Sequence, residues 1–173
     1  MLQLKNRLVD SVEQVFNKLP SVKLVNYIFK NNKDLTFNKK MKDWGITEPS
    51  FSNGAAVGDL DNDGDLDLVV NNINDPAFIY KNNSMDANYL RIKLNGPQGN
   101  LDAIGAKLTV YYQGVSQYVE LRTSRGYLSS SENIVHFGLA KIDKVDSLII
   151  QWNHDQISKL VDIKANQVLK VDI

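Results

Sequence analysis

The sequence contains no cysteine, only two histidines and no excess of charge of either sign. The absence of cysteine excludes a disulfide framework and any zinc site built from thiolates. Basic and acidic residues number 20 each, so the formal net charge is zero. This balance argues against nucleic acid as a partner, because proteins that bind it usually present a basic face. No apolar run reaches the roughly 18 residues that a membrane-spanning helix needs.

The first twenty residues mix apolar and charged positions. The charges interrupt the apolar positions, so the segment lacks the continuous hydrophobic core of a secretory signal. The apolar residues instead recur at helical spacing and are followed by Pro20 as a stop: Leu8, Val12, Val15, Phe16 and Leu19. We therefore predict an amphipathic helix over residues 1–20.

Beyond Pro20 the sequence is typical of β-structure, with short β-branched and aromatic runs between Asn and Asp residues. "YIFKNN" at Tyr27–Asn32 and "FIYKNN" at Phe78–Asn83 lie about 50 residues apart, a spacing typical of propeller blades and similar arrays. One full period fits, whereas a propeller has about four to eight blades. The pattern predicts a piece of a longer protein, or a blade that packs against something else.

A second region starts near Ala87 and contains short segments separated by turn signals, at the spacing of about 8–12 residues that is typical of a β-sandwich. We expect a hairpin to turn at Gln113-Gly114. We also expect Leu148, Ile150 and Trp152, which share one face of a strand, to line the core. The seven predicted strands are Asn88–Leu94, Ala106–Gly114, Val115–Thr123, Asn133–Leu139, Asp146–Trp152, Ile157–Ile163 and Gln167–Ile173.

These patterns predict a mainly β chain in three parts. The first is the N-terminal α-helix over residues 1–20. The second is a partial β-propeller-type blade over residues 21–86, and the third is a roughly seven-stranded β-sandwich over residues 87–173.

The stretch "GDLDNDGDLDLVVNN" places aspartate at five alternate positions. Carboxylates this close repel one another, and no Lys or Arg lies between Asn53 and Tyr80. The simplest local compensation is a hard cation with oxygen ligands, and calcium accepts about six to eight oxygens in irregular geometry. Gly64 would allow the sharp turn. The predicted ligands are the side chains of Asp59, Asp61 and Asp63, the main-chain carbonyl of Asp65, and Asp67, which closes the shell.

Two other interpretations of this stretch stay open. "NDG" also favours a simple acidic hairpin turn. Magnesium is a second candidate cation, although it prefers stricter octahedral geometry and keeps more water than calcium. The first half of the loop matches the EF-hand pattern, but Val70 stands where that pattern has its closing Glu, and a strand follows instead of a helix.

"DLDNDGDLDLVV" resembles the calcium loop of an FG-GAP/VCBS repeat, the blade unit of integrin-like propellers, and the resemblance places the family's ligands on the five aspartates. The region from about Asn88 resembles the ASPIC/UnbV domain in "AIGAKLTVY", "RGYLSSSE", "VHFGLA" and "VDSLIIQW". "WNHDQ" departs from the Pro/Gly turn that relatives tend to have after the tryptophan. The combination is typical of the cartilage acidic protein family and of bacterial surface proteins.

The resemblance implies a non-enzymatic extracellular or cell-surface module for adhesion or recognition. Calcium would stabilise the blade loop, and the sandwich would contact a protein or glycan. The alternative is an accessory carbohydrate-binding or structural domain of a larger enzyme or surface protein, and a third possibility is a structural cap of a propeller array. A homo-oligomer or a longer chain would cover the edges of the blade.

No catalytic site is expected. His136 lies in the strand "VHFGL" and is interpreted as a packing residue, and His154 as a solvated turn residue. A Ser/His/Asp set can be assembled from Ser129–Ser131, His136 and Asp155, but no nucleophile elbow accompanies it. The polar loop Arg122–Glu132 is interpreted as a solvated connection, with sugar or peptide binding as the alternative.

Overall fold

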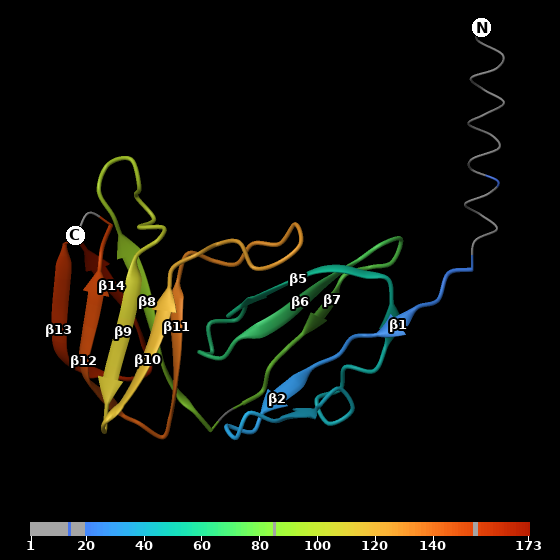
Figure 1. The fold of residues 1–173 in the computed structure, drawn as a ribbon, viewed down its shortest axis with the longest axis horizontal. Helices are drawn as coiled ribbons and strands as arrows, with labels where there is room; N and C mark the ends of the chain where they lie inside the picture. Colours follow the sequence, from blue (N-terminus) through green and yellow to red (C-terminus); the bar gives the residue numbers. More distant parts are fainter. Residues whose placement is uncertain (1–13, 15–19, 85, 154–155) are drawn as a thin grey trace, which may run out of the picture. The chain divides into compact units, whose positions relative to one another are not determined.

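The computed structural model describes residues 14, 20–84, 86–153 and 156–173. Packing divides the chain into two compact units, Met1–Phe51 with Ile73–Asp75 and Ser52–Asn72 with Pro76–Ile173. The described elements are β-strands, which Figure 1 draws along the chain. In the part of the chain that the structure describes, no helix is long and apolar enough to cross a membrane.

The predicted fold class is wrong in one respect. We predicted an N-terminal α-helix over residues 1–20, but the described elements are strands only and include no such helix. Residues 1–13 and 15–19 lie outside the described residues. An amphipathic pattern does not fix a helix by itself, because most helical stability in proteins comes from packing of the apolar face. The described strands form open sheets and no closed propeller, and their mainly β character agrees with the sequence.

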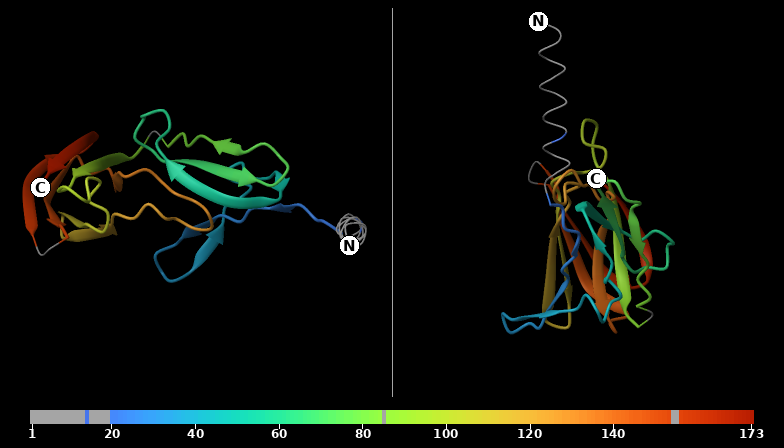
Figure 2. Two further views of the ribbon diagram at one scale, coloured as in Figure 1. Left: turned by 90° about the horizontal axis from the view of Figure 1, so that it is seen from above. Right: turned by 90° about the vertical axis from the view of Figure 1, so that its right-hand side faces the viewer.

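The first unit contains two short antiparallel pairs. β1 (Leu24–Val25) pairs with β4 (Pro49–Ser50), and β2 (Phe29–Asn31) pairs with β3 (Phe37–Lys39). Figure 2 shows the β2–β3 hairpin from two further directions. The apolar side chains of this hairpin are largely exposed, so the hairpin buries little apolar surface within its own unit.

The second unit begins with a three-stranded antiparallel sheet in the order β5-β6-β7. Its strands are β5 (Ser52–Gly58), β6 (Asp67–Asn72) and β7 (Phe78–Tyr80). The register pairs Gly58 with Asp67 and Leu68 with Tyr80. The aspartate loop therefore joins β5 to β6, and the chain leaves β7 beside the start of β6.

Seven further strands of the same unit form two sheets. One sheet has the order β10-β9-β12-β13, and the other has the order β11-β8-β14, in which β14 runs parallel to β8. The strands are β8 (Asn88–Asn95), β9 (Lys107–Tyr112), β10 (Val115–Glu120), β11 (Val135–Ala140), β12 (Lys144–Gln151), β13 (Ile157–Lys164) and β14 (Gln167–Asp172).

The core of these two sheets is built from alternate residues of the strands. Leu148, Ile150 and Trp152 are at most 3% exposed, which confirms their predicted core positions. The predicted hairpin turns at Gln113 (φ 47°) and Gly114 (φ 76°), and left-handed conformations at both central residues are what a type I′ turn requires.

Strand β8 presents two different faces. Leu90, Ile92 and Leu94 are at most 2% exposed and belong to the core cluster. Because side chains alternate along a strand, Tyr89 and Arg91 lie on the opposite face of β8. That face is the one that meets the aspartate loop.

Candidate metal centre

The aspartate loop bends sharply between β5 and β6. Asn62 (φ 61°) and Gly64 (φ 94°) adopt left-handed backbone conformations. A Cβ atom at Gly64 would lie 1.9 Å from Cε1 of Tyr89, so glycine is required both by the backbone and by the neighbouring ring. The sharp turn predicted at Gly64 is observed.

Three of the five aspartates come together in this loop. Asp59, Asp61 and Asp63 each offer one carboxylate oxygen, and these oxygens lie within 4.8 Å of one another. The side chain of Asp59 is 1% exposed, whereas those of Asp61 and Asp63 are 38% and 36% exposed. This arrangement can hold a metal ion that solvent reaches from the side of Asp61 and Asp63.

Asp59 organises the loop from its buried end. Its Oδ1 accepts a hydrogen bond from the Asp63 N–H at 3.1 Å, and its Oδ2 accepts one from the Gly64 N–H at 3.1 Å. The guanidinium of Arg91 also contacts Oδ2, with Nη1 at 2.7 Å. A carboxylate that accepts several such bonds is held in one orientation before any ligand arrives.

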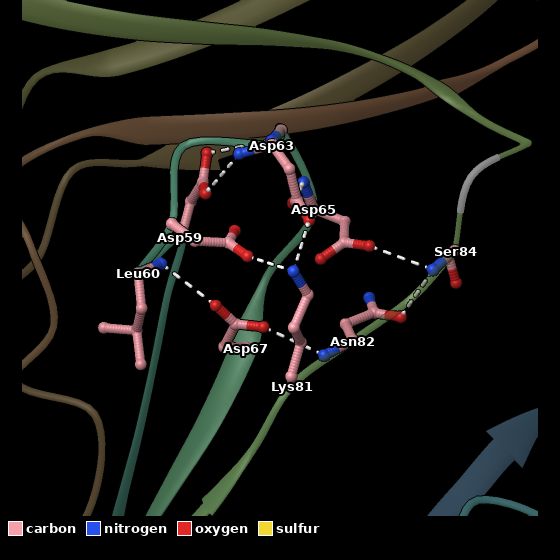
Figure 3. A network of polar contacts seen from close by, with 10 residues as sticks. Asp59, Leu60, Asp63, Asp65, Asp67, Lys81, Asn82 and Ser84 are labelled. Atoms are coloured by element: carbon pink, nitrogen blue, oxygen red, sulfur yellow. Dashed lines mark hydrogen bonds and ion pairs between the residues drawn. The ribbon is translucent and has the colours of Figure 1, made fainter.

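Asp67 lies outside the group of three and holds the loop closed through two hydrogen bonds. Its Oδ2 accepts from the Leu60 N–H at 3.0 Å, and its Oδ1 accepts from the Asn82 N–H at 2.9 Å. The residue is 2% exposed. Asp67 thereby joins the loop, the start of β6 and the segment after β7 (Figure 3).

Asp65 also lies outside the group of three. Its Oδ2 accepts from the Ser84 N–H at 3.0 Å, while its buried Oδ1 has no hydrogen-bond partner among the described residues. Burial, together with the nearby charge of Asp63, raises the pKa of the Asp65 carboxyl. An acceptor oxygen without a donor beside an acidic cluster is what a cation would satisfy.

Lys81 is the residue that the sequence analysis missed on the exposed side of the loop. Its Nζ contacts Oδ2 of Asp61. The same Nζ lies 3.5 Å from Oδ2 of Asp63 (Figure 3). The hydrogen bond to Asp61 raises the pKa of Lys81 and lowers that of Asp61. The register could have revealed this contact, because Tyr80 pairs with Leu68 and Lys81 therefore follows beside Asp67.

Arg91 and Glu132 are the residues missed on the buried side. Arg91 donates from Nη2 to both carboxylate oxygens of Glu132 at 2.9 Å, in addition to its contact with Asp59. No local signal indicates this cluster, because Arg91 and Glu132 lie far from the loop in sequence. Protein side chains therefore compensate part of the aspartate charge, which the search for cations between Asn53 and Tyr80 did not find.

The residues present still fit a hard divalent cation. The cations beside the five carboxylates are the ammonium group of Lys81 and the guanidinium group of Arg91, which also pairs with Glu132. Negative charge therefore remains in excess in the loop. All the candidate donor atoms are oxygens, which suit calcium or magnesium and not a soft metal. Lys81 is 54% exposed on its side chain and can turn away into solvent at little cost.

The remaining candidates from the sequence analysis are His136, His154, Asp155 and the loop Arg122–Glu132. His136 stacks on Tyr89, with ring centroids 6.2 Å apart, and burial together with the charge of Arg91 lowers its pKa. His154 and Asp155 lie outside the described residues. In the loop Arg122–Glu132, the Ser131 N–H donates to the Thr123 carbonyl at 2.9 Å.

In comparison with known proteins, two protein-family models match this chain, and the matches follow one another in the predicted order. Residues 21–70 match the model of the FG-GAP-like repeat, and residues 96–173 match the model described as ASPIC and UnbV.

Two similar curated proteins are both cartilage acidic protein 1. The one from Xenopus tropicalis is 29% identical over 143 residues, which cover 78% of this chain and 22% of the relative. The one from Homo sapiens is 31% identical over 104 residues, which cover 57% of this chain and 15% of the relative. The chain thus spans at most about a fifth of the length of these relatives.

Proposed function

The chain carries an FG-GAP-like repeat followed by an ASPIC and UnbV domain, and on this basis we propose that it is a non-enzymatic, calcium-stabilised module of an extracellular or cell-surface protein. Its role is adhesion or recognition, with a protein or glycan as the partner. The similarity to cartilage acidic protein 1 supports this placement indirectly.

The observation that carries the metal assignment is the meeting of Asp59, Asp61 and Asp63 within 4.8 Å. These three carboxylates supply the first ligands. The main-chain carbonyl of Asp65 and the side chain of Asp67 complete the protein's share of the shell, and water fills the rest. The side chain of Asp65 offers a further acceptor, because its Oδ1 has no hydrogen-bond partner among the described residues.

Lys81 has a defined role in this proposal. Its ammonium group neutralises Asp61 and Asp63 with one positive charge, and a calcium ion brings two charges to the same oxygens. Lys81 therefore competes with the ion and keeps its affinity moderate. An affinity in the range of about 10⁻⁴–10⁻³ M is typical of extracellular modules, where calcium is abundant.

Calorimetric titration with calcium tests the proposal. Binding with one ion per chain is expected for the natural sequence, and it should be lost in Asp61→Ala and in Asp63→Ala. Asp102→Ala is the matched control, because Asp102 is an exposed carboxylate outside the loop and its removal should leave the affinity unchanged. Unaltered binding in both loop variants would refute the assignment, and an equal response to magnesium would refute the choice of calcium.

A further inference from the structure

Two side chains of β8 hold the aspartate loop against the sandwich, within one compact unit of the chain. Tyr89 lies over Gly64, and Arg91 lies 2.7 Å from Oδ2 of Asp59. Both residues project from the face of β8 that is not part of the core. The loop of the FG-GAP-like repeat is therefore fixed in place by the β8 strand that leads into the second family domain.

Arg91 is a buried cation with two anionic partners. Its side chain is 4% exposed, and it reaches Asp59 with Nη1 and both oxygens of Glu132 with Nη2. A buried guanidinium needs such partners, because an uncompensated buried charge is strongly destabilising. A change in the charge at Asp59 therefore alters the interaction between Arg91 and Glu132, because one planar guanidinium group contacts both carboxylates.

Glu132 belongs to the segment between β10 and β11, residues 121–134, which we call the β10–β11 segment. This segment also reaches β5, since a Cβ atom at Gly54 would lie 2.6 Å from Oγ of Ser129 and 2.9 Å from the carbonyl oxygen of Tyr127. At the contact with Gly54 the segment exposes the side chains of Tyr127 (67%) and Leu128 (86%). Leu128 adopts a left-handed conformation, with φ 46°, which a leucine takes only when its surroundings impose it.

We propose, on the premise that the loop binds calcium, that Arg91 is a positioning residue that links the ion to the β10–β11 segment. Calcium and the guanidinium share Asp59, so the ion weakens the hold of Arg91 on Asp59 and strengthens its hold on Glu132. Calcium binding thereby orders the segment that presents Tyr127 and Leu128. By reciprocity, Glu132 favours calcium binding and Arg91 opposes it.

The test compares two variants whose effects on calcium affinity have opposite signs. Arg91→Met removes the competing charge and should tighten binding at least about fivefold, whereas Glu132→Gln leaves Arg91 to Asp59 alone and should weaken it about fivefold. Lys93→Met is the matched control for a general charge effect, because Lys93 is exposed and lies two residues along the same strand. It should change the affinity less than about twofold, since exposed charges are screened. A purely structural role of Arg91 would weaken binding in both of the first two variants.

Hydrogen exchange supplies a second measurement that does not depend on the affinity. In the natural protein, calcium should slow exchange at the amides of the β10–β11 segment, including Ser131, whose N–H donates to the Thr123 carbonyl. The same addition should have no effect on these amides in Arg91→Met, provided that circular dichroism shows the variant to be folded. If Arg91→Met does not fold, Glu132→Gln carries the test alone, with weaker binding and unchanged exchange on calcium addition as the expected result.

The outcomes separate this inference from the proposed function. Calcium binding that is lost in Asp63→Ala but not tightened in a folded Arg91→Met, or exchange in the segment that ignores calcium in the natural protein, overturns the link alone. If Arg91→Met does not fold, undiminished binding in Glu132→Gln overturns it. Absence of calcium binding by the natural protein overturns both.

Discussion

Replacement of Gly64 by alanine tests whether the aspartate loop is held against β8 as the structure shows. Gly64 has φ 94°, and its added Cβ atom would lie 1.9 Å from Cε1 of Tyr89. The left-handed conformation costs a residue other than glycine about 1–2 kcal/mol. Forcing an extra carbon into a packed contact costs about 1–3 kcal/mol more. We therefore expect Gly64→Ala to lower the free energy of unfolding by about 2–5 kcal/mol.

Gly99→Ala is the matched control, because Gly99 has φ 97° and a Cβ atom there would meet nothing within 4 Å. It should cost only the backbone share of about 1–2 kcal/mol. Urea unfolding in the presence of a chelator measures both variants without a contribution from bound calcium. In a Tyr89→Ala background, the cost of Gly64→Ala should fall to that of the control. Equal costs of the two glycine substitutions in the natural background would refute the packing of Tyr89 on the loop.

Three further predictions concern groups around the loop. Lys81→Met should tighten calcium binding in calorimetry, because it removes the ammonium group that contacts Asp61 and Asp63; weaker binding would contradict competition by Lys81. Asp67→Asn should destabilise the chelated protein by about 1–3 kcal/mol in urea unfolding, because the amide cannot accept from both the Leu60 and the Asn82 N–H groups; an unchanged midpoint would contradict this closure. The lowered pKa of His136 means that its proton is bound more readily in the unfolded chain. Stability should therefore fall as the pH drops below about 6.5, and the melting temperature of His136→Gln should fall less over the same range.

Local features of the fold could be predicted from the sequence because short-range patterns determine them. The Gln113-Gly114 turn follows from residues that tolerate positive φ, and the core face of β12 follows from the alternation of Leu148, Ile150 and Trp152. The five aspartates indicated an acidic loop, and the structure brings three of them together. Their role as calcium ligands stays a prediction.

The contacts that surround the loop could not be predicted in the same way. Arg91 contacts Asp59, which lies 32 residues before it, and Glu132, which lies 41 residues after it, and no local spacing specifies such pairs. The parallel pairing of β14 with β8 joins residues 77 positions apart, such as Gln167 and Leu90, and likewise depends on the tertiary arrangement. Lys81 was missed for a different reason, because it lies one residue beyond the stretch in which cations were sought.

The most direct test of the central claim is the melting temperature of the natural chain in excess calcium and in excess chelator. An ion that binds only the folded state at about 100 times its dissociation constant stabilises it by about 2.7 kcal/mol. We therefore predict a rise in melting temperature of several degrees, about 2–4 °C per kcal/mol for a chain of this size, and no rise in Asp63→Ala. An identical melting temperature of the natural chain in calcium and in chelator would contradict the assignment of the aspartate loop as a calcium site.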